Sequence, residues 1–249
     1  MSNEITASLK NVSLEYKLNY YATKSIRDIF VSPFKKKKTL ENVHLALDNI
    51  DLDINKGDII GVLGKNGSGK TSLCQSIAGM IKPNVGDIQI NGNVLPIFNT
   101  SIGVYQHLTG AENALILANL LYPNFSDTKI NQIVEVAKEF SGLEHFLDIP
   151  YENYSTGMKI RLCLSIITSS PSDLIIFDEV YDGADENFKI KIKNRIHELI
   201  DKSKSVLFVS HQLDHIKQIC NKAIIMDKGK IIFNGEVEKA IKIYSSFFN

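Results

Sequence analysis

The spacing of apolar residues divides the chain into strands and helices. Alternating apolar and polar residues are typical of half-buried strands, unbroken apolar runs indicate strands buried on both faces, and apolar residues three or four positions apart indicate helices. By these patterns, strands are expected at 5–18, in two short pieces within 48–64, in a hairpin turning at Asn91-Gly92 within 86–98, at 173–179, at 205–211 and in a closing hairpin within 222–236. Helices are expected at 70–81, 111–122, 126–143, 155–170, 186–203 and 237–248.

The order of these elements predicts the fold. Buried apolar strands that alternate with helices are typical of a mostly parallel sheet with helices on its faces. The first strands and the closing hairpin add an antiparallel β part, and the run of helices in the middle of the chain indicates an inserted α-helical subdomain. We therefore expect a single α/β domain over 1–249, with a core in about 1–105 and 171–249 and a helical subdomain in about 107–170.

Composition narrows the choice of partners and compartment. The formal net charge is zero, so the overall charge gives no reason to expect nucleic acid as a partner. Cys74, Cys163 and Cys220 lie far apart without a Cys-x-x-Cys pair, which favours reduced, buried thiols. The first residues lack the pattern of a secretory signal, and no run approaches the roughly 20 apolar residues of a membrane-spanning helix. If the protein works at a membrane, another chain is expected to span it.

The stretch GKNGSGKT, residues 64–71, lies between a buried strand and a helix. Glycines at this spacing let backbone N–H groups curl around phosphate oxygens, while Lys70 can reach the β and γ phosphates and the Thr71 hydroxyl can ligate Mg²⁺. A chance glycine turn is the alternative, and the strand–loop–helix context argues against it. The sequence therefore predicts nucleoside triphosphate binding, with contacts from Gly64, Lys65, Asn66, Gly67, Ser68, Gly69, Lys70, Thr71 and Ser72.

Two later strands end in polar residues suited to phosphoryl transfer. LIIFDE brings Asp178 to its strand end as a Mg²⁺ ligand and Glu179 as the residue that polarises the attacking water. A helix-capping role for this pair is the alternative, and the four apolar residues before it argue against that role. VLFVSH brings His211 to the end of the next strand, where it can contact a γ phosphate, although a lone histidine is often structural. The predicted catalytic residues are Glu179, His211 and Lys70.

A further motif, YSTGMKIRL, follows the phosphate-binding stretch at a distance. With it, the chain resembles an ATP-binding cassette (ABC) ATPase, whose signature begins a helix of the inserted subdomain. The usual signature is Leu-Ser-Gly-Gly-Gln; here Tyr154, Thr156 and Met158 replace three of the five residues, while Ser155 and Gly157 remain. The resemblance covers nearly the whole chain.

The replaced residues point to one subgroup of that family. YSTGM resembles the Tyr-Ser-(Ser/Thr)-Gly-Met signature of cassettes that export capsule, O-antigen or teichoic-acid polysaccharides. HLTGAENALI, which begins at His107, resembles the Leu-Thr-Gly-Arg-Glu-Asn stretch of this subgroup, with Ala111 in place of arginine. FDEVYDGADENF resembles its Asp-Glu-Val…Gly-Asp…Phe run, with one residue shifted around Gly183.

The resemblance also implies roles for individual residues. Tyr16 would stack on adenine, although plain core packing is the alternative. Gln106 would touch Mg²⁺ and couple to the membrane partner, although its spacing to the Leu-Thr-Gly stretch is one residue off the subgroup pattern. Asp185 would belong to a loop that crosses a dimer interface. The signature would bind the γ phosphate of the ATP held by a second copy of the chain, through Ser155, Thr156, Gly157 and Met158.

As a whole, the resemblance implies the ATP-hydrolysing subunit of an ABC transporter for lipid-linked polysaccharide. It would work with Mg²⁺ as a homodimer with two ATP at the interface, peripheral on the cytoplasmic face of the cytoplasmic membrane, with a separate transmembrane permease. An ABC transporter ATPase for another cargo, such as a lipid or drug, is the alternative. A soluble ABC ATPase acting on ribosomes or DNA is disfavoured by a single cassette without heptads. The aromatic and lysine-rich segment 19–45 suits a membrane surface or a solvated loop equally well.

Overall fold

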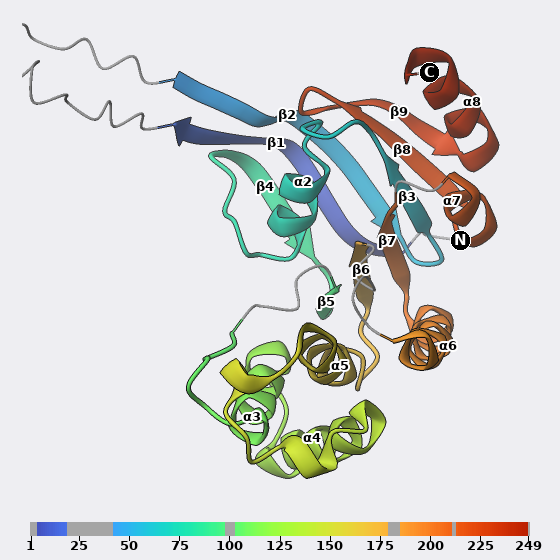
Figure 1. Ribbon diagram of the computed structural model, residues 1–249. Helices are drawn as coiled ribbons and strands as arrows, with labels where there is room; N and C mark the ends of the chain where they lie inside the picture. The colour runs from blue at the N-terminus through green and yellow to red at the C-terminus, as the bar shows by residue number, and fades with distance from the viewer. Residues whose placement is uncertain (1–3, 19–41, 98–102, 179–184, 211–212, 249) are drawn as a thin grey trace, which may run out of the picture.

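The computed structural model describes residues 4–18, 42–97, 103–178, 185–210 and 213–248 (Figure 1). The strands are β1 (Ile5–Leu18), β2 (Asn42–Asn55), β3 (Ile59–Leu63), β4 (Val85–Ile90), β5 (Val94–Ile97), β6 (Leu174–Asp178), β7 (Ser205–Val209), β8 (Lys222–Asp227) and β9 (Lys230–Glu236). The helices are α2 (Lys70–Ile77), α3 (Gly110–Leu121), α4 (Asp127–Ser141), α5 (Thr156–Ile167), α6 (Glu186–Lys202), α7 (Leu213–Ile219) and α8 (Val237–Phe248). Two short 3₁₀ turns, at Glu144–Phe146 and Tyr151–Asn153, connect α4 to α5.

The strands form two sheets. A six-stranded sheet has the order β5-β6-β7-β3-β8-β9; its strands are parallel except for β9, which closes an antiparallel hairpin with β8. A three-stranded antiparallel sheet has the order β2-β1-β4. This architecture confirms the expected α/β class with a mostly parallel sheet and an antiparallel β part.

The central strands of the six-stranded sheet divide their side chains between two hydrophobic cores. Successive side chains of a strand point to opposite faces, so Leu174 and Ile176 of β6 enter one core while Ile175 and Phe177 enter the other. The first core contains β1, β2 and α2, and the second contains the helices α3 to α6 with α8. Burial on both faces is the reason why these strands contain unbroken apolar runs, such as Leu174–Phe177 in β6 and Val206–Val209 in β7.

One expectation about local structure was wrong, and one helix was not expected. Residues 86–98 do not form a hairpin, because β4 pairs with β1 in one sheet while β5 pairs with β6 in the other. The chain turns between them at Gly92 (φ 121°), and the following N–H of Asn93 donates to the Asp173 carboxylate (2.8 Å). Helix α7 was not expected: it has only seven residues, although Leu213, Ile216 and Ile219 follow one another at helical spacing and pack against the second core.

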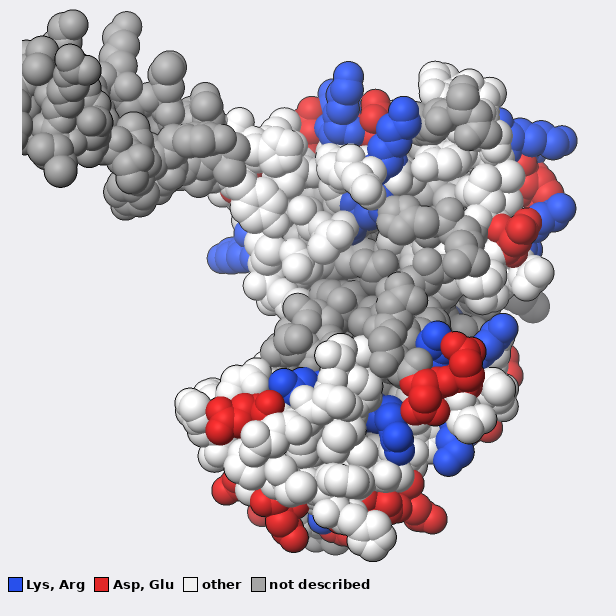
Figure 2. Space-filling view, in the orientation of Figure 1, with Lys and Arg blue, Asp and Glu red and all other residues white. Residues whose placement is uncertain are grey.

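Helices α3, α4 and α5 gather below the six-stranded sheet, and α5 packs against β5 (Figure 1). They are the helices expected for the inserted subdomain, whose boundaries stay a prediction. Within the described ranges, no helix combines the length and the apolar character that crossing a membrane requires. Lys, Arg, Asp and Glu side chains are interspersed on the face that Figure 2 shows, in keeping with the zero net charge.

Candidate functional site

The segment GKNGSGKT, called here the phosphate loop (residues 64–71), connects β3 to α2. Its last glycine, Gly69, is the N-cap of α2 in a left-handed conformation (φ 103°) and provides no side-chain cap. Helices α3, α4, α5 and α6 each begin at a residue whose side chain accepts a hydrogen bond from the first turn. Because the first N–H groups of a helix have no intrahelical acceptor, the uncapped start of α2 is suited to bind an anion.

The glycines of the phosphate loop have two different environments. A Cβ at Gly64 would lie 2.6 Å from the carbonyl oxygen of Met226, and a Cβ at Gly69 would lie 2.5 Å from that of Ala46. At Gly67 (φ 81°) a Cβ would meet nothing within 4 Å. The loop is therefore held from behind by β2 and β8, while the turn at Gly67 opens outward, where a ligand can approach the backbone.

The side chain of Lys70 folds back into the phosphate loop. Its Nζ donates to the carbonyl oxygens of Gly64 (2.7 Å) and Lys65 (3.0 Å), and the residue is only 7% exposed. The hydroxyl of Ser68 is buried as well, and no described residue provides it with a hydrogen-bond partner. The buried ammonium group of Lys70 fits a bound phosphate, because a phosphate supplies both negative charge and acceptor oxygens, whereas the Ser68 hydroxyl lies on the back of the loop beside Gly64 and does not line the cleft.

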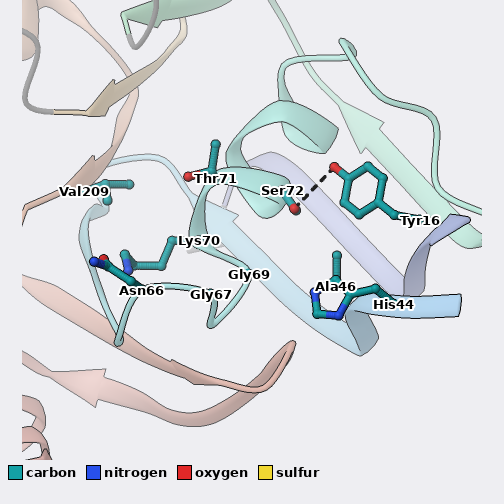
Figure 3. Close-up of a pocket in the computed structure, with 10 residues that line it drawn as sticks. All are labelled: Tyr16, His44, Ala46, Asn66, Gly67, Gly69, Lys70, Thr71, Ser72 and Val209. Carbon is teal, nitrogen blue, oxygen red and sulfur yellow. Dashed lines mark hydrogen bonds between the residues drawn. The ribbon is translucent and has the colours of Figure 1, made fainter. Parts of the chain in front are cut away.

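A cleft of about 230 Å³ opens in front of the phosphate loop (Figure 3). Asn66, Lys70 and Val209 lie at one end of it, and Tyr16 and His44 lie at the other. The Tyr16 hydroxyl is 3.4 Å from Oγ of Ser72, which fixes the ring against α2. The cleft thus has a phosphate-binding end and an aromatic end, as a nucleotide requires. Its lining consists of Tyr16, His44, Ala46, Asn66, Gly67, Gly69, Lys70, Thr71, Ser72 and Val209.

The predicted Mg²⁺ ligands are only partly described. The Thr71 side chain is exposed and lines the cleft. Asp178 ends β6 as the ladder partner of Val209, so its backbone lies at the edge of the cleft. A hydroxyl oxygen and an adjacent acidic position suit the oxygen ligands that Mg²⁺ prefers. The side chain of Asp178 and the predicted catalytic residues Glu179 and His211 lie outside the described residues.

The predicted coupling residue Gln106 does not line the cleft; it is exposed in the Gln106 loop (residues 105–109). Asn113, which is 2% exposed, organises this loop from inside. Its amide nitrogen donates to the carbonyl oxygens of Tyr105 (2.9 Å), Leu108 (3.1 Å) and Thr109 (2.9 Å), and its amide oxygen accepts from the Tyr105 N–H (2.7 Å). The asparagine of the Leu-Thr-Gly-Ala-Glu-Asn stretch therefore shapes the loop that carries Gln106.

Helix α3 begins immediately after this loop, with a capping box. The Thr109 hydroxyl accepts from the Glu112 N–H, and the Glu112 carboxylate accepts from the Thr109 N–H (2.8 Å). The Thr109 backbone and hydroxyl donors hold the pKa of Glu112 below its usual range. The cap fixes the point at which the Gln106 loop enters the helix.

The Gln106 loop is joined to the segment before the signature. The N–H of Glu152 donates to the carbonyl oxygen of Gln106 (2.9 Å), and that of Tyr151 donates to the carbonyl oxygen of Leu108 (2.8 Å). The side chains of His107 and Glu152 approach to 3.3 Å on the surface. These contacts bind residues 105–110 and 149–154 into one unit that leads directly into α5.

The signature begins α5 and lies away from the cleft of its own chain. Ser155 is the N-cap, and its hydroxyl accepts from the Met158 N–H (3.2 Å). Ser155 and Thr156 are exposed, and Gly157 and Met158 are half-buried. None of these four lines the described cleft. The structure therefore leaves this helix start facing outward, available to a ligand held elsewhere.

Asp185 is also remote from the described cleft lining. It caps α6 by accepting a hydrogen bond from the Phe188 N–H (3.0 Å), and it lies 3.6 Å from a guanidinium nitrogen of Arg161 on α5. Arg161 also donates through Nε to the carbonyl oxygen of Ser141 (2.8 Å). The arginine thus connects the start of α6 with α5 and the end of α4, a role that the sequence did not predict.

Sequence reasoning also missed three residues that line the cleft: His44, Ala46 and Val209. His44 and Ala46 reach it only because β2 pairs with β1 in one particular register. No local pattern encodes that register, so the sequence offered no signal for these two residues. Val209 could have been inferred as the residue two positions before His211, at the end of the same strand.

Comparisons with known proteins identify the family of this chain. The family described as ABC transporter matches residues 47–182. The teichoic acids export ATP-binding protein TagH of Staphylococcus haemolyticus (strain JCSC1435) is 32% identical over 98% of this chain and 89% of its own length. TagH of Listeria innocua serovar 6a is 32% identical over 99% of this chain and 72% of its own length.

Solved structures show the same fold. A dimeric post-hydrolysis structure of the ATP-binding cassette MJ0796, bound to ADP and Pi, has a TM-score of 0.68 at 18% identity and covers 93% of this chain and 98% of that chain. A structure of the ATP-binding subunit of an ABC transporter has a TM-score of 0.71 at 21% identity and covers 98% and 95%, respectively. The phosphate loop, the signature, the fold and the near full-length relatives agree, and the chain therefore belongs to the ABC transporter family of ATPases.

Proposed function

We propose that this chain is the ATP-hydrolysing subunit of a transporter that exports a lipid-linked polysaccharide across the cytoplasmic membrane. The observation that carries the proposal is similarity over almost the whole chain to proteins named for teichoic acids export. The Tyr-Ser-Thr-Gly-Met signature at 154–158 supports the same cargo class. The chain would work as a homodimer, peripheral on the cytoplasmic face, beside a separate transmembrane permease.

One half of each ATP site would come from the phosphate loop of one subunit. The first turn of α2 donates N–H groups to the phosphates, and the Lys70 ammonium adds a fixed positive charge from within the loop. Thr71 and Asp178 would hold Mg²⁺, which when bound neutralises charge on the β and γ phosphates. Gln106 does not line the cleft in this structure, so it would join these ligands only after its loop moves toward the phosphate loop. Glu179 would orient the attacking water and His211 would contact the γ phosphate, both by their positions after β6 and β7.

The other half of each site would come from the partner's signature. Ser155, Thr156, Gly157 and Met158 lie at the outward-facing start of α5, where the helix dipole favours an anion. Two copies of the chain would then enclose two ATP molecules between them. The MJ0796 cassette, which has the same fold, is described as dimeric with ADP and Pi bound, and this supports the arrangement.

The route from this dimer to the permease would run through the Gln106 loop. Its backbone contacts with residues 149–154 place Gln106 and the signature in one unit. A displacement of that unit by the permease would move the signature relative to the partner's phosphate loop. ATP closure and permease movement would be coupled in this way.

The test is the surface polysaccharide of the source organism carrying Glu179→Gln in place of the native chain. We expect loss of polymer outside the cell and accumulation of lipid-linked polymer on the cytoplasmic side. Glu139→Gln, an exposed carboxylate on α4, is the matched control. Normal surface polymer with a variant confirmed inactive as an ATPase would contradict the polysaccharide assignment and favour another cargo.

A further inference from the structure

The aromatic end of the cleft is built by two residues that face each other across two strands. Tyr16 of β1 and His44 of β2 are direct partners in the antiparallel ladder, and the register is regular on both sides of them, from Glu15 to Leu18. Directly opposed residues share a face of the sheet, with Cβ atoms about 4.5–5.5 Å apart. That spacing is too narrow to hold a flat base between the rings, which needs about 7 Å, or two carbon–carbon contact distances. The two rings can instead form one continuous surface.

The next residue of β2 on the same face connects this surface to the phosphate loop. Ala46 follows His44 by two positions and lies at a bulge of β2, because Glu15 pairs with Leu45 while Leu14 pairs with Leu47, and both His44 and Ala46 line the cleft. Its carbonyl oxygen lies against Gly69 of the phosphate loop, so closely that a Cβ atom at Gly69 would be 2.5 Å from it. Figure 3 shows Ala46 between His44 and Gly69. Because alanine is small, it leaves space for a sugar between the rings and the phosphate loop.

The His44 ring is free to accept a ligand. It is exposed, and no hydrogen bond or ion pair joins it to another residue of the described chain. A neutral imidazole has a flat aromatic face, one N–H donor and one nitrogen acceptor. Tyr16 differs, because its hydroxyl is held near Ser72 on α2.

From these observations we infer that His44 is a binding residue for the base of the nucleotide, forming a two-ring platform with Tyr16. The inference rests on the proposed function only in taking a nucleoside triphosphate as the occupant of the cleft. The triphosphate lies at the Lys70 end, the sugar passes Ala46, and the base covers the rings of Tyr16 and His44. His44 therefore contributes to the affinity for a nucleotide and not to the affinity for a bare triphosphate.

The experiment measures the dissociation constants of MgATP and of magnesium tripolyphosphate by calorimetry, using the full chain. His44→Ala should bind MgATP about fivefold to tenfold more weakly, which is the lower end of the effect of losing one base–ring stacking contact. The same variant should bind tripolyphosphate with the affinity of the wild type. His44→Phe should retain most of the MgATP affinity, because it keeps an aromatic face. His197→Ala, an exposed histidine on α6, is the control. Thermal denaturation of each variant checks that the chain is folded.

Three results would overturn the platform: unchanged MgATP affinity in His44→Ala, an equal loss for both probes, or a His44→Phe variant as weak as His44→Ala. Lys70→Ala separates this failure from failure of the proposed function. It should weaken the binding of both probes, since both carry the triphosphate. If it weakens neither, the phosphate loop is not the triphosphate site, and the proposed function and the platform are both wrong. If it weakens both while His44→Ala changes nothing, only the platform is wrong.

Discussion

The phenol oxygen of Tyr154 lies against the Cα of Gly110, so closely that a side chain at Gly110 would overlap it. The same hydroxyl donates to the carbonyl oxygen of Phe146 (2.7 Å), and burial raises the pKa of the phenol. Tyr154 is the first residue of the signature, and Gly110 belongs to the Leu-Thr-Gly-Ala-Glu-Asn stretch. Two motifs that are far apart in the sequence are therefore one packing unit, in which the tyrosine requires the glycine.

Gly110→Ala should destabilise the fold by about 1–3 kcal/mol, the usual cost of overpacking a filled site. Tyr154→Leu removes the ring and should recover most of that loss in the double variant. Urea denaturation of the wild type, the two single variants and the double variant measures the coupling energy between the two positions. Additive effects of the two substitutions would show that the residues do not constrain each other.

Lys70→Ala should reduce ATP turnover by at least about 100-fold, comparable to the loss of one preorganised donor in a catalytic site. The reason is that the variant removes the cation held inside the phosphate loop. Steady-state release of phosphate is the measurement, and Lys82→Ala, an exposed lysine just beyond α2, is the control. Turnover at the wild-type rate would contradict the assignment of the phosphate loop.

Glu179→Gln should slow hydrolysis and allow ATP-bound dimers to accumulate, because the change keeps the shape of the side chain and removes its basic oxygen. The prediction rests on the position of Glu179 directly after β6. Size-exclusion chromatography with light scattering, with and without MgATP, distinguishes monomers from dimers. A variant that binds MgATP and stays monomeric would argue against the arrangement of two ATP between two chains.

Asn113→Ala should loosen the Gln106 loop and lower stability by about 2–3 kcal/mol, since the two amide hydrogens and the amide oxygen of the side chain each make a hydrogen bond worth about 1 kcal/mol. Hydrogen exchange should increase at residues 105–109. Asn119→Ala is a matched control, because Asn119 lies on the same helix, is exposed, and bonds only the Leu115 carbonyl oxygen of its own helix. If hydrogen exchange at residues 105–109 were the same in the two variants, Asn113 would not be the residue that organises the Gln106 loop.

Asp173 should make stability depend on pH in the acid range. The Asn93 N–H, followed by Lys204, lowers the pKa of its carboxyl. Because the folded pKa lies below the unfolded value of about 3.9, the ionised carboxylate stabilises the fold above that pH. This contribution is lost as the pH falls through the folded pKa.

The stability difference between wild type and Asp173→Asn should therefore be largest near neutral pH and vanish in strong acid. Urea denaturation from about pH 7 to pH 2 measures it. Asp201→Asn, at an exposed position of α6, is the control. A difference that grows as the pH falls would contradict a stabilising role of the ionised carboxylate.

The local parts of the protein were determined by the sequence alone. β1 covers the expected residues 5–18, and the helices α3 to α6 and α8 begin and end within a few residues of the expected limits. The phosphate loop and the signature could be identified because their chemistry lies in consecutive residues. Apolar periodicity and helix caps act over a few positions, so a single sequence contains them.

Contacts between distant segments were decided only by the tertiary structure. The Asn91-Gly92 dipeptide favoured a hairpin between β4 and β5. In the structure, β4 instead pairs with the edge of β1 and β5 pairs with the edge of β6, so the two strands belong to different sheets. The pairing of Tyr16 with His44, the packing of Tyr154 on Gly110 and the bonds of Asn113 also depend on a register or a close approach. A shift of one residue in a strand would turn His44 away from the cleft. Such choices are settled by the packing of the whole core, and the local sequence does not contain them.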